Sequence, residues 1–486
     1  MKTGAEQKLK DMGVTLPPAP KPLGAYVEAV QVGHLVFLSG TLPVEDGTKV
    51  QSQLRARCII TTPTMWHQAA KRRRAMELSA GWFGSGAQSF IVALFVLYAA
   101  VAVTARASDH LDSPATVANP QADIADVYAW PSPDGKRLYL VMTIQAHAFS
   151  NKIDYVIHLD SGRVFGHTTA STSIGCRFAA ANEVQCKLGT SDSVSGDPTS
   201  PNGLEGQHHL VRVYAGLRDD PFYNNIKGLL AAYQTAGEAI KKGAPIDVSG
   251  CAHFDADTSK AILEQMRHTD GGPAKNFLYN WTVSAIVVSV DLGAVTTGGK
   301  ILAVWGSTSS AGKQLDRMAR PFVVNTLLGV APFSTDDASG LRREEYNAAL
   351  PGDSARFSTD LQKSLAFQDS LDGECGNQFL AEPHESPARY AKLASVFADD
   401  RLWVNSAARV CTQFFAVEIA SLTDQAGLSQ DCGGRTPTYD TSNAWRSLLI
   451  SGTLTGITDG LTRDEHSPSA TVFPFLAPPA PERVDH

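Results

Sequence analysis

The sequence predicts an α+β protein with a mainly antiparallel β core, helices inserted between the strands and at the C-terminal end, and disulfide bonds. Runs of β-branched and aromatic residues bounded by turn residues recur from Arg137 onward. Helical runs lie between groups of strands and do not alternate with them one by one, which disfavours a parallel sheet. Six of the seven cysteines follow residue 107, and an even number in an exported region is typical of disulfides.

The first 49 residues contain LPPAPKPLGAYVEAVQVGHLVFLSGTLPVEDG, which resembles the opening of a reactive-intermediate deaminase of the Rid family. The matching positions are Pro17–Tyr26, Gly33, Phe37, Leu38, Ser39, Gly40 and Pro43. The resemblance covers the first third of such a domain, and the family's substrate-binding arginine has no counterpart. Two strands cannot bury a core. We therefore expect residues 1–49 to be a truncated, inactive remnant that does not fold independently; the deaminase alternative predicts turnover of 2-aminoacrylate.

Residues 50–107 are expected to be a linker followed by a signal peptide. Four basic residues, 71–74, precede the fourteen apolar residues Phe90–Val103, and Ala105-Arg106-Ala107 follows. This order predicts secretion with cleavage after Ala107, and the apolar run is short for a membrane span, which needs about 20 residues. Translation from Met65 keeps the basic residues, whereas Met76 gives a more usual leader length. The alternative is that a chain starting at Met1 keeps Phe90–Val103 as an uncleaved anchor.

The region from residue 108 to residue 486 is expected to be one exported domain. Expected strands are 137–145, 153–160, 209–214, 281–292 and 300–307, each a run of β-branched and aromatic residues. Expected helices, with apolar residues at three-and-four spacing, are Asn224–Lys242, Ser259–His268, Asp316–Leu328 and most of Pro387–Leu422. In the third of these helices, Asp316 and Arg320 would form an i,i+4 salt bridge.

The charge distribution excludes one class of partner. Residues 1–107 contain 12 Lys+Arg and 6 Asp+Glu, whereas the remaining residues contain 30 and 43. An acidic exported domain argues against nucleic acid as a partner, because phosphate binding needs clustered positive charge. We expect membrane contact only through the signal segment. The acidic balance is compatible with a bound cation.

The six cysteines after residue 107 allow 15 pairings. Cys176 and Cys186 flank a short segment that could turn as a hairpin, so a Cys176–Cys186 disulfide is the expected local pairing. The alternative is buried free thiols. No Cys-x-x-Cys occurs, which disfavours a zinc ribbon or a thioredoxin-like site.

Several phrases in this region resemble an exported family, domain-of-unknown-function family 4331. They are His110-x-Asp112-x-Pro114, Ala122-Asp123-x-x-Asp126-x-Tyr128-Ala129-Trp130, Gly216–Tyr223, Asp316–Leu328 and Phe473–Pro479. Their order resembles that family over about residues 108–480. The resemblance implies a periplasmic or extracellular location, and the family has no agreed activity.

Acidic residues and a histidine gather at the start of this domain and predict a cation site. The five candidate ligands are Asp109, His110, Asp112, Asp123 and Asp126. Carboxylates favour Ca²⁺, and a new terminus at Ser108 with His110 third could bind Cu²⁺ through nitrogen. The alternative is that the aspartates cap turns. Asp219 and Asp220, before a proline, are secondary candidates whose alternative is a turn start.

Known catalytic motifs are missing, including His-Glu-x-x-His, Gly-x-Ser-x-Gly, phosphate loops and dinucleotide fingerprints. We therefore expect an exported binding or structural protein, with a cation as a candidate ligand. The alternative is a metal-dependent periplasmic enzyme that uses His110 and the nearby carboxylates.

Overall fold

A computed structural model describes residues 29–32, 35–38, 44–45, 48–49, 112–328, 336–353 and 356–479. The chain divides into two compact units, 1–99 and 100–486. In the first unit, β1 (Ala29–Val32) pairs antiparallel with β2 (Leu35–Leu38), and β3 (Val44–Glu45) pairs with β4 (Thr48–Lys49). The expected signal peptide, with Phe90–Val103 and the cleavage position Ala107, lies outside the described residues.

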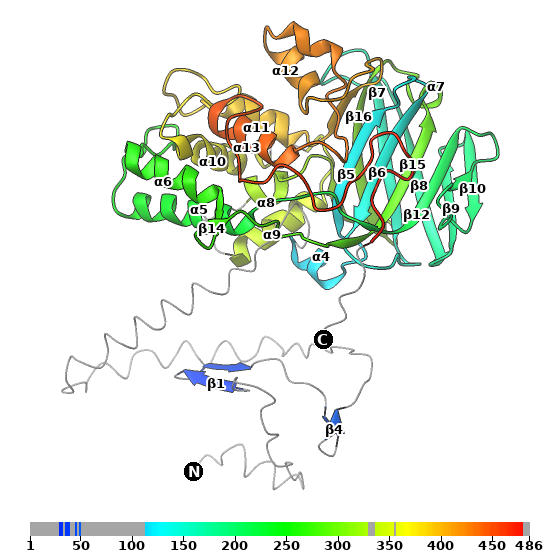
Figure 1. Cartoon of the computed structure of the whole chain (residues 1–486), viewed down its shortest axis with the longest axis horizontal. Helices are drawn as coiled ribbons and strands as arrows, with labels where there is room; N and C mark the ends of the chain where they lie inside the picture. The colour runs from blue at the N-terminus through cyan, green and yellow to red at the C-terminus, as the bar shows by residue number, and fades with distance from the viewer. Residues whose placement is uncertain are drawn as a thin grey trace. The chain divides into compact units, whose positions relative to one another are not determined.

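The second unit confirms the α+β class and contains two antiparallel sheets (Figure 1). The larger sheet has the order β10-β9-β8-β7-β16-β17, with β18 also paired to β16, and the smaller has the order β11-β12-β15-β6-β5. The strands of the larger sheet are β7 (Asp154–Gly162), β8 (Ala170–Ala180), β9 (Glu183–Leu188), β10 (Asp192–Gly196), β16 (Ile301–Ser310), β17 (Lys313–Met318) and β18 (Leu402–Asn405). Those of the smaller sheet are β5 (Ile124–Pro131), β6 (Arg137–Ile144), β11 (Leu204–Glu205), β12 (Val211–Asp219) and β15 (Thr282–Asp291). A short pair, β13 (His268–Thr269) and β14 (Gly272–Pro273), lies apart from both sheets.

The two sheets pack against each other through β5 and β16. At this contact Gly306 of β16 faces β5 and β6, and a Cβ added there would lie 2.9 Å from the sulfur of Met142. Every residue of β5 is buried, whereas β7 alternates buried and half-buried positions. The alternation shows that β7 has one face in the core and one toward solvent.

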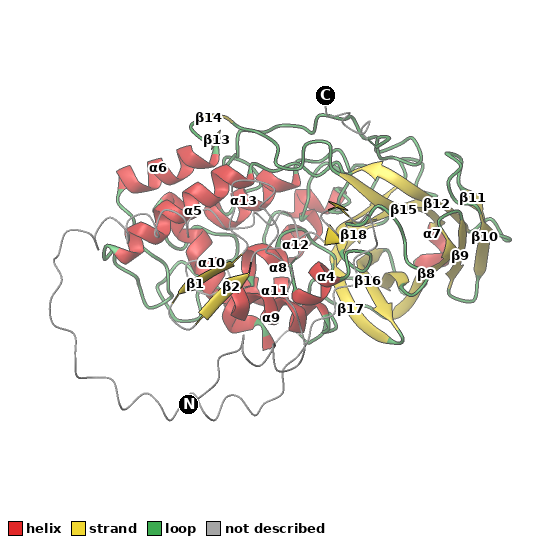
Figure 2. Cartoon of the chain, turned by 90° about the horizontal axis from the view of Figure 1, so that it is seen from below, coloured by secondary structure: helices red, strands yellow, loops and turns green. Residues whose placement is uncertain are grey.

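The helices of this unit lie mostly at the end opposite the sheets, although α7 lies among the strands (Figure 2). They are α4 (Pro114–Ala118), α5 (Ile226–Lys241), α6 (Ala256–Met266), α7 (Leu292–Val295), α8 (Val323–Leu327), α9 (Asp336–Asn347), α10 (Ser358–Asp369), α11 (Ala391–Ala398), α12 (Ala416–Leu422) and α13 (Thr441–Ser451), with 3₁₀ turns η3 (Ser370–Asp372) and η4 (Ala426–Gln430). The expected helices over Asn224–Lys242 and Ser259–His268 are confirmed as α5 and α6. Asn225 and Asp255 cap them by accepting backbone N–H bonds. Among the described residues, no helix combines the length and apolar character that a bilayer span requires.

The expected helix over Asp316–Leu328 is wrong in its first half. Asp316 belongs to β17, which extends the sheet beside β16, and helix begins only after Phe322, whose φ is 70°. The expected Asp316–Arg320 salt bridge is therefore wrong as well. Arg320 is buried and donates instead to Glu418 at 2.9 Å, with Asp400 at 3.8 Å.

The region Pro387–Leu422 is helical only at its two ends, in α11 and α12. Between them β18 pairs with β16, so the apolar residues Leu402 and Trp403 are buried as part of the larger sheet. Sheet pairing here overrides a helix-like spacing of apolar residues.

Three disulfides are present among the described residues. The expected Cys176–Cys186 bond is confirmed and joins directly opposed positions on β8 and β9. Cys251–Cys375 and Cys411–Cys432 tie together parts of the helical region and its loops.

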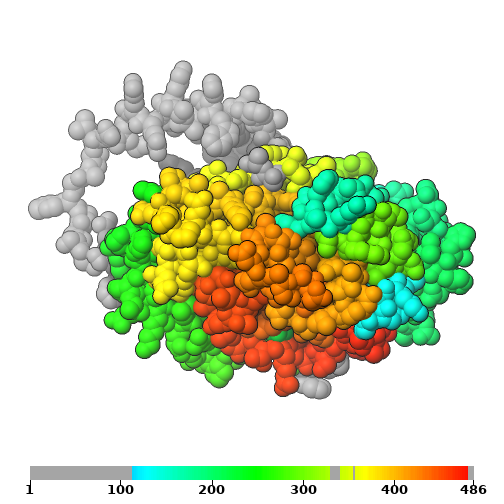
Figure 3. Space-filling model, turned by 90° about the horizontal axis from the view of Figure 1, so that it is seen from above, coloured from blue at the N-terminus to red at the C-terminus, as the bar shows by residue number. Residues whose placement is uncertain are grey.

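The C-terminal part of the chain runs over the surface between the two ends of the molecule. Figure 3 shows this segment (red) in contact with the helical side (green and yellow) and near the first strands (cyan). Its anchors include Asp459, which accepts the N–H of Asn225 at 2.9 Å, and Ala477, which accepts the N–H of Asp219 at 3.1 Å. Residues far apart in the sequence meet at these anchors.

Candidate cation site

The expected N-terminal cluster is only partly described, because Asp109 and His110 lie outside the described residues. Asp112 is buried before α4, where it accepts a hydrogen bond from Thr116 at 2.9 Å and two from the amide of Asn347 at 3.0 and 3.1 Å. Burial raises the pKa of the Asp112 carboxyl, and these hydrogen bonds partly offset the rise. Asp112 therefore fixes the N-terminal segment to α9.

Asp123 and Asp112 lie near a third buried carboxyl, that of Asp316. Asp316 accepts the backbone N–H of Ile124 at 2.7 Å. Burial raises the pKa of Asp316 well above its usual range, and the negative charges of Asp112 and Asp123 raise it further. Three mutually repelling acids thus surround the start of β5.

Asp126 lies in a different environment from Asp123, beside the buried Arg435, with which it forms an ion pair. Arg435 also reaches the hydroxyl of Tyr128 at 3.3 Å, and that hydroxyl donates to Asp220 at 3.3 Å. Burial raises the pKa of Asp220 well above its usual range, and Asp126 adds to the effect. One arginine therefore faces two carboxyls in the core.

No group of three or more potential ligands within 4.8 Å of one another includes Asp112, Asp123 or Asp126, among the described residues. Asp112 and Asp123 approach Asp316, while Asp126 approaches Asp220 and Arg435. The five-residue N-terminal site remains a prediction, since two of its members are not described.

One of the secondary candidates does belong to such a group. Asp219, Asp464, Glu465 and His466 each offer a ligand atom, and all four atoms lie within 4.8 Å of one another. We call these four residues the Asp219 site. The other secondary candidate, Asp220, is not a member. Side chains of neighbouring residues on an extended strand point to opposite faces, and Asp220 turns to Tyr128 and Thr143 in the core.

The Asp219 site joins the end of β12 to the loop that follows α13. Asp459 lies within that loop and accepts hydrogen bonds from the backbone N–H of Asn225 and from Arg446 at 3.2 Å, which fixes the path of the loop. Asn276 then donates through its amide to Asp464 at 3.2 Å and to Glu465 at 3.0 Å. The Asn280 N–H also donates to Glu465. Two acids are therefore held side by side by neutral amides, which do not balance their charge.

The electrostatics of the Asp219 site show an excess of negative charge. Burial raises the pKa of Asp464 to about 9, and the adjacent Glu465 and Asp219 contribute. Burial also raises the pKa of Asp219. The pKa of Glu465 falls because hydrogen bonds from Asp464, Asn280 and Asn276 outweigh its burial. In the absence of a cation, a proton on Asp464 relieves the repulsion.

Asp219 and His466 are in direct contact within the site. The Oδ1 atom of Asp219 lies 3.1 Å from the Nδ1 atom of His466, and this contact partly offsets the rise that burial causes in the pKa of Asp219. Asp219 is 2% exposed. A protonated His466 would make this contact an ion pair, and a shared cation would make the two atoms co-ligands.

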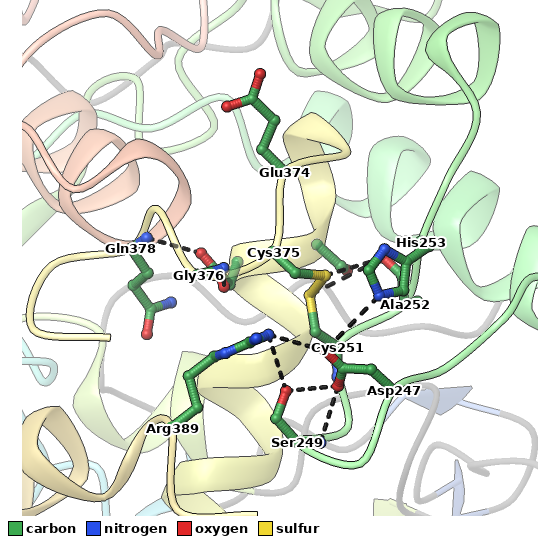
Figure 4. Close-up of a disulfide and its surroundings, with 12 residues drawn as sticks. Asp247, Ser249, Cys251, Ala252, His253, Glu374, Cys375, Gly376, Gln378 and Arg389 are labelled. Carbon is green, nitrogen blue, oxygen red and sulfur yellow. Dashed lines mark hydrogen bonds and ion pairs between the residues drawn. A yellow bond between two sulfur atoms is a disulfide. The ribbon is translucent and has the colours of Figure 1, made fainter. Parts of the chain in front are cut away.

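Two other groups satisfy the 4.8 Å criterion, but each includes disulfide-bonded cysteine. Asp247, His253 and Cys375 lie beside the Cys251–Cys375 bond (Figure 4). There Asp247 accepts from Arg389 at 2.8 Å and from Ser249, so its carboxylate is already paired. Cys411, Asp431 and Cys432 surround the third disulfide. Since the thiolate is the metal-binding form of cysteine, neither group is a metal site while oxidised.

Comparison with family models, curated proteins and solved structures found no match for this chain. The Asp219 site is therefore the feature of this chain from which a function can be inferred. The sequence signal that marks it is the run Asp464-Glu465-His466, three consecutive ligand-type residues in a polar segment, which sequence reasoning overlooked.

Proposed function

We propose that the protein is an exported binding protein that holds one divalent cation at the Asp219 site. The single observation that carries the proposal is the meeting of four ligand-type side chains, one imidazole and three carboxyls, within 4.8 Å. The three disulfides support the exported location, because such bonds persist outside the reducing cytoplasm.

The surroundings favour a cation over a purely structural cluster. No Lys or Arg forms an ion pair with Asp219, Asp464 or Glu465 among the described residues, in contrast to Asp126 and Glu418, which have buried arginine partners. Asp219 and Asp464 are buried, whereas Glu465 is exposed, and buried carboxylates without a positive partner are costly. A divalent ion would supply the missing charge, and Asn276 would orient two of its ligands from behind.

The donor set indicates the class of ion. Ca²⁺ and Mg²⁺ favour oxygen ligands only, whereas imidazole nitrogen suits first-row transition ions. A site with one nitrogen and three carboxylates therefore favours Mn²⁺ or Zn²⁺ over Ca²⁺. Such an ion would tie the C-terminal loop to the end of β12.

Isothermal titration of the purified chain with Mn²⁺, Zn²⁺ and Ca²⁺, after treatment with chelator, tests the proposal. We expect one transition ion per chain, and loss of binding in Asp464→Asn and His466→Ala. Asp353→Asn and His208→Ala are matched controls because both side chains are exposed and neither belongs to the site; His208 precedes the start of β12, whereas Asp219 is its last residue. Binding that survives in both site variants, or binding of none of the three ions, would contradict the proposal.

A further inference from the structure

The outer face of the larger sheet carries a hollow that none of the preceding argument uses. It has a volume of about 340 Å³ and lies over β7, β8 and β9, with Ser309 of β16 at one side. Ligand pockets in proteins begin at about 300 Å³. We call it the Gly175 hollow, after the residue at its centre.

The hollow follows from the register of the strands. One row of paired residues across the sheet consists of Lys187, Gly175, Val156 and Ser307. Two residues further along, Gln185 pairs with Arg177 and Asp154 pairs with Ser309, and an ion pair joins Arg177 to Asp154. Gly175 has no side chain, so the longer side chains on the neighbouring strands surround an empty space above its backbone. The hollow is thus a consequence of one glycine in a strand.

Gly175 is not required by the backbone. Its φ lies outside the left-handed region, and a Cβ built there would meet only Val156, at 3.9 Å, an ordinary van der Waals contact. A larger side chain would therefore fit the fold while it fills the hollow. Strand interiors favour residues with side chains, so a glycine here has a cost that a bound molecule would explain.

The walls carry two cations, Lys187 and Arg177, and one carboxylate, that of Asp154, so one positive charge is in excess. Lys187 is exposed and forms no ion pair among the residues that the structure describes. Arg177 donates through Nε and Nη2 to Asp154, which leaves its Nη1 group for another acceptor. These cations stand on adjacent strands in a domain with 43 acidic and 30 basic residues after position 107. The charge complements an anion.

The remaining walls are neutral and polar, with the hydroxyls of Ser173 and Ser309 and the amide of Gln185. Such groups can donate hydrogen bonds to the hydroxyls of a ligand and accept hydrogen bonds from them. The Cys176–Cys186 disulfide joins β8 to β9 at the residue pair that lies between the Gly175–Lys187 pair and the Arg177–Gln185 pair. It holds the two cationic positions at a fixed spacing, which lowers the entropy cost of binding.

From these observations we infer that the Gly175 hollow binds a carboxylate-bearing sugar, with the carboxylate between Lys187 and Arg177 and its hydroxyls on Ser173 and Ser309. The inference does not depend on the Asp219 site, which lies on a different sheet. It concerns the chemical class of the ligand: one negative charge and several hydroxyls on a molecule of one or two rings.

Titration calorimetry with galacturonate tests the inference, with galactose as the uncharged counterpart and inorganic phosphate as an anion without the sugar ring. We expect galacturonate to bind at least about tenfold more tightly than either, the gain typical of a charge-assisted contact. Equal binding of galactose would show that the charge is not recognised. Equal binding of phosphate would show that the sugar ring and its hydroxyls are not recognised. Either result, or no binding of galacturonate, overturns the inference.

Three variants locate the binding. Gly175→Leu fills the hollow and Lys187→Met removes its unpaired charge, and each should weaken galacturonate binding by about tenfold or more. Lys260→Met, at an exposed position on α6, is the matched control and should bind as the native chain does. A thermal melt checks that Gly175→Leu folds; if it does not, Lys187→Met alone decides. Native affinity in Lys187→Met would overturn the inference.

Discussion

The Oδ1 atom of Asp219 lies 3.1 Å from the Nδ1 atom of His466, although the two residues are far apart in the sequence. Asp219 is the last residue of β12, and His466 follows the loop anchored by Asp459. The contact therefore exists only because the C-terminal segment returns across the surface to the smaller sheet. A cation there would link stability of that segment to metal binding.

Cation binding at the Asp219 site should release a proton. Burial and the adjacent carboxyls hold the pKa of Asp464 at about 9, so this group is protonated at pH 7 in the ion-free protein. A metal ligand must be deprotonated. The affinity for Mn²⁺ should therefore increase as the pH rises from 7 toward 9, by up to about tenfold per unit. Calorimetric titrations with Mn²⁺ at pH 7, in buffers of different ionisation enthalpy, measure the number of protons released on binding. Equal heats of binding in all of the buffers would contradict the predicted proton release.

Removal of Arg435 should destabilise the fold strongly. Arg435 is 1% exposed and is the positive partner of Asp126, next to the second carboxyl of Asp220. Arg435→Met leaves buried carboxyls without their cation, a change that costs roughly 3–5 kcal/mol. Urea unfolding measures the loss. Arg409→Met, at an exposed position, is the control and should change stability by less than about 1 kcal/mol.

Acid should weaken the fold partly through His158. This ring stacks on Trp305 at 3.7 Å and bonds Ser307 at 2.8 Å, and burial lowers its pKa to about 4 from an ordinary 6.5. The unfolded chain therefore takes up a proton at a higher pH than the folded chain does. The stability due to neutral His158 is complete above pH 6.5 and is lost as the pH falls toward 4, by roughly 3 kcal/mol.

His158→Phe removes this titration while keeping a ring against Trp305. The free energy of unfolding of the variant, measured in urea at pH 7 and pH 4.5, should fall less between the two values than that of the native chain. His208→Phe, at an exposed position, is the control. An identical fall in the native chain and in His158→Phe would contradict the assignment.

The three disulfides should differ in their contribution to stability. Cys251–Cys375 closes a loop of 124 residues, whereas Cys176–Cys186 closes one of 10. The loop-entropy relation predicts that loss of the longer link costs about 2 kcal/mol more. Paired Cys→Ser variants, compared by urea unfolding, test this. A larger loss from the Cys176–Cys186 pair would show that strand pairing matters more than loop length.

The sequence predicts a helix or strand correctly where the periodicity of its apolar residues is strong. The prediction fails where pairing with a strand far away in the sequence determines the secondary structure. The β-branched run 281–292 becomes β15, and the spacing in 224–242 becomes α5. The strand β8, rich in Ser, Thr and Ala, has no such signal and forms because it pairs with β7 and β9. The prediction of a helix at Asp316 is wrong for the same reason, because that segment pairs with β16 and forms the strand β17.

The site is predictable only in part, for a physical reason. Asp219 could be selected as an acidic residue before a turn, and Asp464-Glu465-His466 is visible as a run of ligand-type residues. Their meeting depends on the long return of the chain, fixed by Asn225, Arg446 and Asp459. A contact over so many residues has no local signature. The sequence could not predict either that Asp123 and Asp126 lie in different environments, because this depends on the ion pair between Arg435 and Asp126 of β5.

A crystal structure of the chain grown with Mn²⁺, with anomalous differences measured at the manganese edge, tests the central claim most directly. The account predicts one strong anomalous peak among Asp219, Asp464, Glu465 and His466, with ligand distances near 2.2 Å for a first-row ion, about as for other carboxylate and imidazole sites. A map with no peak at these four residues, or with its only strong peak elsewhere on the domain, would contradict it.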